Sequence, residues 1–242
     1  MADKPVLPIT RENLASGTLA RLVAERNDSQ TKLASDEELL ASRRAMVPDD
    51  ADTSDIWVFG YGSLIFNPVM DYVARARGRI YGHHRRFCLW TRLGRGSPDC
   101  PGLVLALDRG GSCTGVAFKL NPELSIAELD LLWRREMVTL AYRASWLTFH
   151  PDGGSDAGQG TGAGTKRAIS FIARPERENY AAPMTLKDEA DVIATATGFI
   201  GPCRDYLFDT VKALEEDGIS DPHLKKLRRA VELRLASEEG VG

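Results

Sequence analysis

The stretch Trp57-Val-Phe-Gly-Tyr-Gly-Ser-Leu-Ile-Phe66 joins a short apolar run to a loop that is suited to holding a ligand. The run from Ile56 to Phe59 predicts a buried strand, which ends at a glycine, a tyrosine, a second glycine and a serine. Glycines lack side-chain bulk and tolerate unusual backbone angles, so backbone N–H groups here can approach a bound group. One interpretation is therefore an anion cradle, and the alternative is a turn or bulge in which glycine serves backbone geometry alone.

The loop does not follow the known nucleotide-binding patterns. A phosphate loop has more glycines and a Lys-Ser/Thr pair before a helix, whereas the first lysine after this loop is Lys119. The spacing also differs from the dinucleotide fingerprint. If the loop holds an anion, a carboxylate or an oxyanion fits it better than a phosphate, and no nucleotide cofactor is expected.

The composition of the 242 residues is that of a globular protein, with 43% apolar and 27% charged residues. A net charge of −3 argues against a nucleic-acid partner. No apolar run approaches the ~20 residues of a membrane span. The N-terminal Met1-Ala-Asp-Lys-Pro lacks the order of a secretory signal. We expect a cytoplasmic protein with no membrane partner, and its oligomeric state is left open.

The cysteines and histidines do not predict a metal site. The four cysteines are scattered without a C-x-x-C pair, and His150 and His223 have no partner at metal-ligand spacing. Cys88 and Cys113 lie in apolar runs, which predicts buried, reduced thiols. No metal is expected. The other two cysteines are Cys100 and Cys203.

The pattern of the chain changes near residue 56. Residues 1–55 are predicted to form a polar, partly helical arm, 56–236 one domain with a flexible glycine-rich insertion at 152–165, and 237–242 a tail. After Trp57 strands dominate the first part and helices the last, so the predicted fold class is α+β, with a small mixed-sheet, barrel-like core and flanking helices. The predicted strands are 57–59, 80–90, 103–107, 113–120, 145–150 and 167–173. The predicted helices are 14–24, 36–46, 123–136, 186–197, 204–216 and 222–235.

Glu136 is the candidate acid or base. In the predicted helix that ends at this residue, Leu129 and Trp133 lie on one apolar stripe, which Glu136 continues. A carboxylate on a buried stripe is costly unless paired, and burial raises its pKa toward that of a general base. Arg134 and Arg135 would lower that pKa. The alternative is a helix-end glutamate that reaches solvent and pairs with an arginine.

An arginine-rich stretch follows the loop, with no acidic residue between Asp71 and Asp99. The planar guanidinium suits carboxylates and phosphates. On an alternating strand Arg85 and Arg86 face opposite sides, so these arginines do not all line one pocket, and most are expected to face solvent. Tyr206 begins a late helix, where a tyrosine packs in the core and its hydroxyl reaches a partner. The arginines are Arg75, Arg77, Arg79, Arg85, Arg86, Arg92 and Arg95.

Four landmarks in order resemble the ChaC-type γ-glutamylcyclotransferase family, in its glutathione-specific branch. They are WVFGYGSLIF at 57–66, GHHRRFCLW at 82–90, WRREMVTLAY at 133–142 and GPCRDYLFDTVKAL at 201–214. The resemblance implies a small barrel-like mixed sheet with flanking helices. It also implies a cofactor-independent cyclisation of glutathione into 5-oxoproline and cysteinyl-glycine. Two alternatives stay open: cyclisation of other γ-glutamyl amides or amines, and a non-catalytic γ-glutamyl-binding module.

The resemblance also assigns roles to residues. It makes Glu136 the catalytic acid/base and places Tyr206 near the substrate. The chain departs from the family pattern at 91–100, before Pro101-Gly102, and at Met137-Val-Thr, where the family often has two glycines. The residues matched to the loop that holds the γ-glutamyl group are Gly60, Tyr61, Gly62, Ser63, Leu64 and Ile65.

Overall fold

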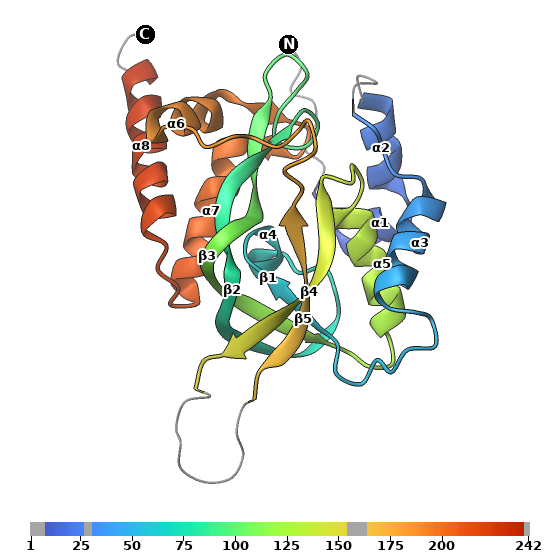
Figure 1. Ribbon diagram of the computed structural model, residues 1–242. Coiled ribbons are helices and arrows are strands. Elements are labelled where there is room, and N and C mark those ends of the chain that lie inside the picture. Colours follow the sequence, from blue (N-terminus) through green and yellow to red (C-terminus); the bar gives the residue numbers. More distant parts are fainter. Residues whose placement is uncertain (1–7, 27–30, 154–163, 240–242) are drawn as a thin grey trace. The chain divides into compact units, whose positions relative to one another are not determined.

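The computed structural model describes residues 8–26, 31–153 and 164–239 (Figure 1). These residues fall into two compact units. The barrel unit comprises residues Leu33–Arg86 and Ala106–Arg174. The helical unit comprises the described parts of Met1–Lys32, Phe87–Leu105 and Pro175–Gly242. The two longest strands contribute residues to both units, and each unit is described below by itself.

A closed barrel of mixed strands forms the centre of the barrel unit, in the order β1-β3-β2-β4-β5. β1 is antiparallel to β3 and parallel to β5, which closes the ring. β4 and β5 pair antiparallel from Tyr142↔Ala173 to Phe149↔Lys166. This arrangement confirms the predicted α+β class. The strands are β1 (Trp57–Gly60), β2 (Tyr72–Thr91), β3 (Gly102–Leu120), β4 (Tyr142–Pro151) and β5 (Lys166–Ala173).

Aromatic and aliphatic side chains fill the barrel. The rings of Phe59 and Phe149 lie 5.7 Å apart between centroids, and both residues are fully buried. Trp133 of helix α5 (Ser125–Glu136) meets the ring of Phe171 edge-on at 5.5 Å. This contact places α5, which ends at Glu136, against the outside of a barrel strand.

Two strand predictions were wrong at their ends. The predicted strands 103–107 and 113–120 are one strand, because Gly110 and Gly111 adopt positive φ angles of 92° and 68° and bend β3 without ending it. β2 begins at Tyr72, eight residues before the predicted start at Ile80. Side chains from Tyr72 to Arg75 are all exposed, so this part of the strand lacks the apolar alternation that predicts strands.

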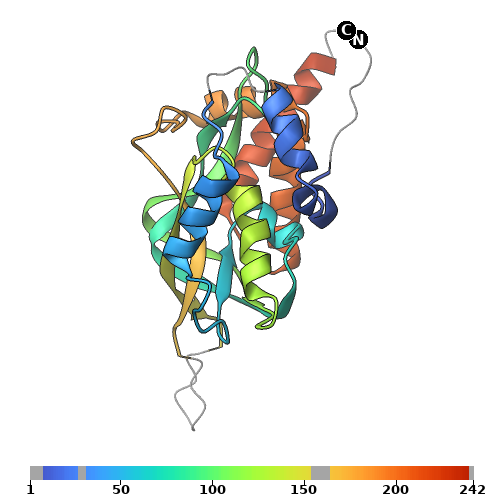
Figure 2. The same cartoon turned by 90° about the vertical axis from the view of Figure 1, so that its right-hand side faces the viewer.

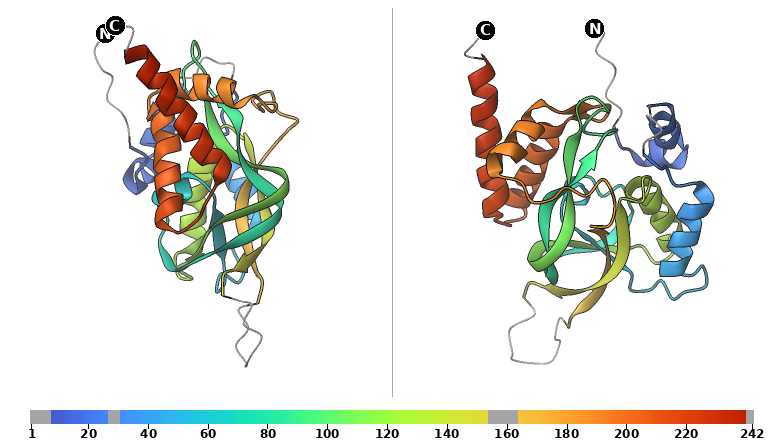
Figure 3. Two further views of the ribbon diagram at one scale, coloured as in Figure 1. Left: turned by 90° about the vertical axis from the view of Figure 1, so that its left-hand side faces the viewer. Right: turned by 45° about the horizontal axis from the view of Figure 1, so that its top comes forward.

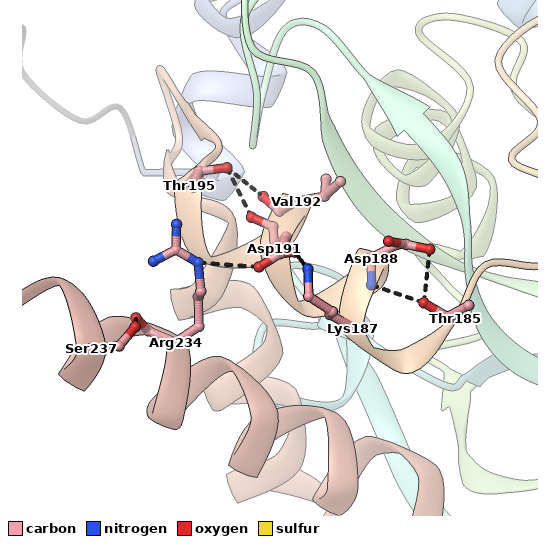
Figure 4. A network of polar contacts seen from close by, with 8 residues as sticks. All are labelled: Thr185, Lys187, Asp188, Asp191, Val192, Thr195, Arg234 and Ser237. Atoms are coloured by element: carbon pink, nitrogen blue, oxygen red, sulfur yellow. Dashed lines mark hydrogen bonds and ion pairs between the residues drawn. The ribbon is translucent and has the colours of Figure 1, made fainter.

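Three helices pack together in the helical unit: α6 (Leu186–Thr195), α7 (Cys203–Glu216) and α8 (Pro222–Glu239) (Figure 3). Asp191 of α6 accepts from Lys187 at 2.7 Å and from Arg234 of α8 at 3.1 Å, which ties these two helices together (Figure 4). The predicted helix 186–197 ends at Thr195 because β6 (Thr197–Gly198) pairs with β7 (Gly201–Pro202).

The predicted helix 14–24 was also wrong. It is two helices, α1 (Arg11–Ala15) and α2 (Thr18–Arg26), separated at Gly17, whose φ of 69° is the left-handed conformation that glycine favours. The predicted helix 36–46 is confirmed as α3 (Asp36–Met46). It belongs to the barrel unit and lies alongside α5 (Figure 2).

Parts of three predicted segments lie outside the described residues: the arm at 1–7 and 27–30, the insertion at 154–163 and the tail at 240–242. The division into arm, domain and tail stays a prediction. None of the helices within the described ranges is long and apolar enough to cross a membrane.

Candidate functional site

The predicted loop Gly60–Ile65 begins at the last residue of β1, turns at Tyr61 and Gly62, and continues into the single-turn helix α4 (Ser63–Phe66). A Cβ atom added to Gly60 would lie 3.0 Å from Cβ of Leu64 and 3.4 Å from the ring of Phe118. A Cβ atom on Gly115 would lie 2.4 Å from the carbonyl oxygen of Gly60. Close approach of the backbone therefore requires glycine at position 115, and a side chain at position 60 would crowd Leu64. Gly62 has a negative φ of −147°, so the left-handed region is not used there.

The other side chains of the loop are held by the barrel unit. The Tyr61 hydroxyl donates to the carbonyl oxygen of Phe171 at 2.7 Å, and both Leu64 and Ile65 are buried. The Gly62 carbonyl oxygen accepts from the Ile65 N–H at 2.9 Å. Most side chains of the loop thus serve the fold, which leaves its backbone and the partly exposed Ser63 to face a ligand.

Arg85 supports the loop from β2. This side chain is buried and donates through Nε to the carbonyl oxygen of Tyr61 and through Nη2 to that of Thr114, at 2.5 and 2.6 Å. Arg86 instead pairs with Asp108 at 2.8 Å, so the two neighbours have separate partners, as the strand alternation predicts. The sequence identified the arginine-rich stretch but not the role of Arg85 beneath the loop.

Glu136 is the last residue of α5, and its side chain is 13% exposed. Burial raises the pKa of this carboxyl group, and the nearby positive charge of Arg135 opposes the rise. Leu129 and Trp133 on the same helix are buried, which confirms the predicted apolar stripe. Glu136 pairs with an arginine, as in the alternative interpretation, but its side chain does not extend into solvent.

Arg135 connects the glutamate to the loop. Its side chain is 3% exposed, and its Nε lies 3.0 Å from Oε1 of Glu136. The same guanidinium donates through Nη2 to Oγ of Ser63 at 2.9 Å and through Nη1 to the carbonyl oxygen of Asn67. A guanidinium has no acceptor atoms, so the Ser63 hydroxyl must accept this bond and keeps its own hydrogen for donation. No pattern in the sequence indicated these long-range contacts of Arg135.

Backbone strain is found in the two segments that Arg135 joins. Val69, two residues after Asn67, has a φ of 54°, and Leu140, four residues after Glu136, has a φ of 52°. Among the described residues they are the only non-glycine positions with positive φ. Such conformations cost about 1–3 kcal/mol and tend to occur at functional sites.

Tyr206 lies in the helical unit, in the first turns of α7. Its ring is buried and meets Phe87 edge-on at 5.9 Å, and the guanidinium of Arg95 lies 5.8 Å from the ring centroid. The predicted core position is confirmed. Its predicted contact with the substrate stays a prediction.

The cysteines are structural in the described part of the chain. Cys88, Cys113 and Cys203 are buried, which confirms the prediction for the first two. Burial raises the pKa of the Cys203 thiol to about 11, so this group is protonated at neutral pH and is not a thiolate nucleophile. No group of three His, Cys, Asp or Glu side chains in the described ranges is placed to hold a metal ion.

The closed mixed barrel is the fold of the γ-glutamyl cyclotransferases. A solved structure of a γ-glutamyl cyclotransferase specific to glutathione, from yeast, superposes with a TM-score of 0.65 at 25% identity, covering 74% of this chain and 96% of that one. A model of the ChaC-like protein family matches residues 56–234, and the chain belongs to this family.

Curated relatives agree with this assignment. The glutathione-specific γ-glutamylcyclotransferase of Escherichia coli (strain K12) is 37% identical over 207 residues, which are 86% of each chain. Glutathione-specific γ-glutamylcyclotransferase 1 of Homo sapiens is 30% identical over 187 residues, covering 76% of this chain and 81% of the human protein. The resemblance inferred from the four sequence landmarks is confirmed.

Proposed function

We propose that this protein is a glutathione-specific γ-glutamylcyclotransferase, a lyase that releases 5-oxoproline and cysteinyl-glycine without a cofactor. The observation that carries the proposal is the largely buried carboxylate of Glu136, whose pKa is raised and which is linked to the Gly60–Ile65 loop through Arg135. The names of the bacterial and human relatives support glutathione as the substrate.

The reaction is an intramolecular acyl transfer. The α-amine nitrogen of the γ-glutamyl group attacks the γ-carbonyl carbon, and the new C–N bond closes a five-membered ring. The bond from that carbon to the cysteine nitrogen then breaks. An attack within one molecule needs only the reactive conformer and correct proton transfers, because well-oriented intramolecular reactions reach effective molarities of about 10⁵–10⁸ M.

Glu136 is proposed to move the proton. At neutral pH the α-amine is mostly protonated, so a base must accept a proton before or during the attack. The carboxylate of Glu136 accepts it and returns it to the departing nitrogen, which leaves as the amine of cysteinyl-glycine. Burial suits both steps, since a raised pKa strengthens the carboxylate as a base near neutral pH.

The loop is proposed to hold the γ-glutamyl group. Backbone N–H groups of Gly60–Leu64 bind the α-carboxylate or the tetrahedral oxyanion, at a place where Gly60 presents no side chain. The hydroxyl of Ser63 donates to the same anion, since Arg135 occupies it as an acceptor. Tyr206 is kept as a substrate-binding residue on the strength of its sequence landmark. A cytoplasmic location, with no nucleic-acid partner, completes the proposal.

The test is 5-oxoproline release from glutathione and from a panel of other γ-glutamyl amides and amines. Glu136→Gln keeps the shape but cannot accept the proton, so we expect activity to fall at least ~100-fold. Glu123→Gln, at an exposed position before the same helix, is the matched control and should stay near wild type.

The outcomes separate the alternatives. Release from other γ-glutamyl compounds but not from glutathione would change the substrate class. Binding without release from any compound would favour the non-catalytic module. Normal turnover by Glu136→Gln would show that another group is the base.

A further inference from the structure

Residues 33–49 lie outside the family match at 56–234, yet they pack along the helix that carries Glu136 (Figure 2). They contain α3, whose first turn is closed by a capping box between Ser35 and Glu38. Leu39 and Arg43 are buried on this helix, although Arg43 carries a charge. A capped helix with a buried face indicates a fixed part of the barrel unit.

Helices α3 and α5 pack antiparallel, so that later residues of α3 contact earlier residues of α5. Arg43 donates through Nε to Oδ1 of Asp130 at 2.7 Å. One turn later on α5, the indole N–H of Trp133 donates to Oγ of Ser42 at 3.2 Å. Glu136 follows Trp133 by three residues, so these contacts hold the helix within one turn of its carboxylate.

The segment also binds the chain after Glu136. The backbone N–H of Ala34 donates to the carbonyl oxygen of Val138 at 2.8 Å. This bond lies where the chain leaves α5 through a turn, in which Leu140 N–H donates to Met137 O at 3.1 Å and Leu140 has positive φ. The segment 33–49 therefore contacts the chain on both sides of Glu136, at Trp133 three residues before it and at Val138 two residues after it.

Arg43 makes this docking specific. It is 1% exposed, pairs with Asp130 and with Asp49 at 2.5 Å, and donates to the carbonyl oxygen of Val47 at 3.0 Å. A buried charge is strongly destabilising when one partner is lost, so a register that separated Arg43 from Asp130 would be unfavourable. The network thus favours one alignment of α3 on α5.

We propose that residues 33–49 are a positioning element for Glu136, which hold its helix end in the geometry required for proton transfer. The inference rests on the proposed function. Displacing a reacting group by about 1 Å costs up to ~100-fold in rate even when the change is remote from the chemistry. Loss of these contacts should therefore lower kcat and leave KM nearly unchanged, because Ala34 bonds Val138 and Ser42 bonds Trp133, on either side of Glu136, rather than the Gly60–Ile65 loop.

The first test compares Ala34→Pro with Ala34→Gly, by steady-state kinetics of 5-oxoproline release. Proline removes the N–H that bonds Val138, whereas glycine keeps it. We expect Ala34→Pro to lower kcat at least ~10-fold with KM within ~3-fold, and Ala34→Gly to stay within ~3-fold of wild type for both. Circular dichroism of both variants checks that they are folded.

The second test compares Ser42→Ala with Ser42→Thr. It remains informative even if Ala34→Pro does not fold. Alanine removes the acceptor of the Trp133 indole, and threonine keeps a hydroxyl. We expect about a fivefold loss of kcat for Ser42→Ala and recovery in Ser42→Thr.

The results distinguish this inference from the proposed function. Folded Ala34→Pro and Ser42→Ala proteins with wild-type kcat would overturn the positioning role alone, as would a rise in KM at constant kcat. A wild-type protein that releases no 5-oxoproline would overturn the proposed function and this role with it.

Discussion

The Nε of Arg135 lies 3.0 Å from Oε1 of Glu136, while Nη2 of the same guanidinium donates to Ser63. Glu136 is thus the proposed base, and Arg135, its neighbour in the sequence, links this base to the loop. A planar guanidinium is suited to this because its donors are held in one rigid fork.

Replacing Arg135 should shift the pH dependence of activity. Arg135 opposes the rise in the pKa of Glu136, so Arg135→Met should raise that pKa further. The base works deprotonated, so the acidic limb of the kcat/KM profile moves to higher pH, and activity at pH 6 falls more than at pH 8. We expect an overall loss of ~10–100-fold, because the loop is released as well.

Two controls sharpen that measurement. Arg135→Lys keeps the charge but not the fork, so it should restore the position of the acidic limb more than the rate. The charge that opposes the rise in the pKa of Glu136 is that of Arg135, so Arg134→Met should leave the limb in place. An unchanged limb in Arg135→Met would contradict the coupling.

Gly60→Ala should destabilise the barrel unit. Its new methyl group would lie 3.0 Å from Cβ of Leu64, and overpacking of this kind costs about 1–3 kcal/mol. Lower entropy of the unfolded chain returns only ~0.4–1 kcal/mol. Thermal unfolding should show a lower Tm, with reduced activity from the displaced α4. Gly164→Ala is the control, since an added Cβ there meets nothing within 4 Å.

Tyr206→Phe tests the residue whose substrate role rests on a sequence landmark. Phenylalanine keeps the ring contact with Phe87 and removes only the hydroxyl. Loss of one hydrogen bond to the substrate should raise KM about fivefold at nearly constant kcat. Unchanged KM and kcat would remove Tyr206 from the site and leave it a core residue of α7.

Glu136→Gln should change how stability depends on pH. The carboxyl pKa is raised above its ordinary value of 4.5, so the folded protein favours the protonated group. Its cost to stability is absent below that value and grows as pH rises through the folded-state pKa. The Tm of Glu136→Gln should therefore exceed that of wild type at pH 8 and match it at pH 4. A constant difference across this range would mean that the carboxylate is not desolvated.

Most of the fold was predictable because it depends on patterns among residues that are close in the sequence. The buried strand before Gly60 and the stripe of Leu129 and Trp133 are patterns of near neighbours, and both were placed correctly. The predictions failed where a single glycine decides whether an element continues. The chain breaks between two helices at Gly17, whereas at Gly110 the strand bends and continues, and the sequence alone does not distinguish these two effects of glycine. The early part of β2 was missed because its exposed side chains have no apolar alternation.

The site was predictable in its parts but not in its connections. The loop and Glu136 were identified from residue type and family landmarks. The bond from Arg135 to Ser63 spans 72 positions, and that from Arg43 to Asp130 spans 87. Such pairs leave no periodic trace in a single sequence. Their detection needs the three-dimensional arrangement of α3, α4 and α5.

The left-handed backbone at Val69 and Leu140 has a consequence for engineering this protein. Glycine would relieve the strain at both positions, although it would also remove two half-buried apolar side chains. Those same substitutions would loosen the chain on either side of the Arg135 contacts and lower turnover. Relief of backbone strain and catalytic activity are therefore opposed at these two residues, and a variant with a relaxed backbone there would be a slower catalyst.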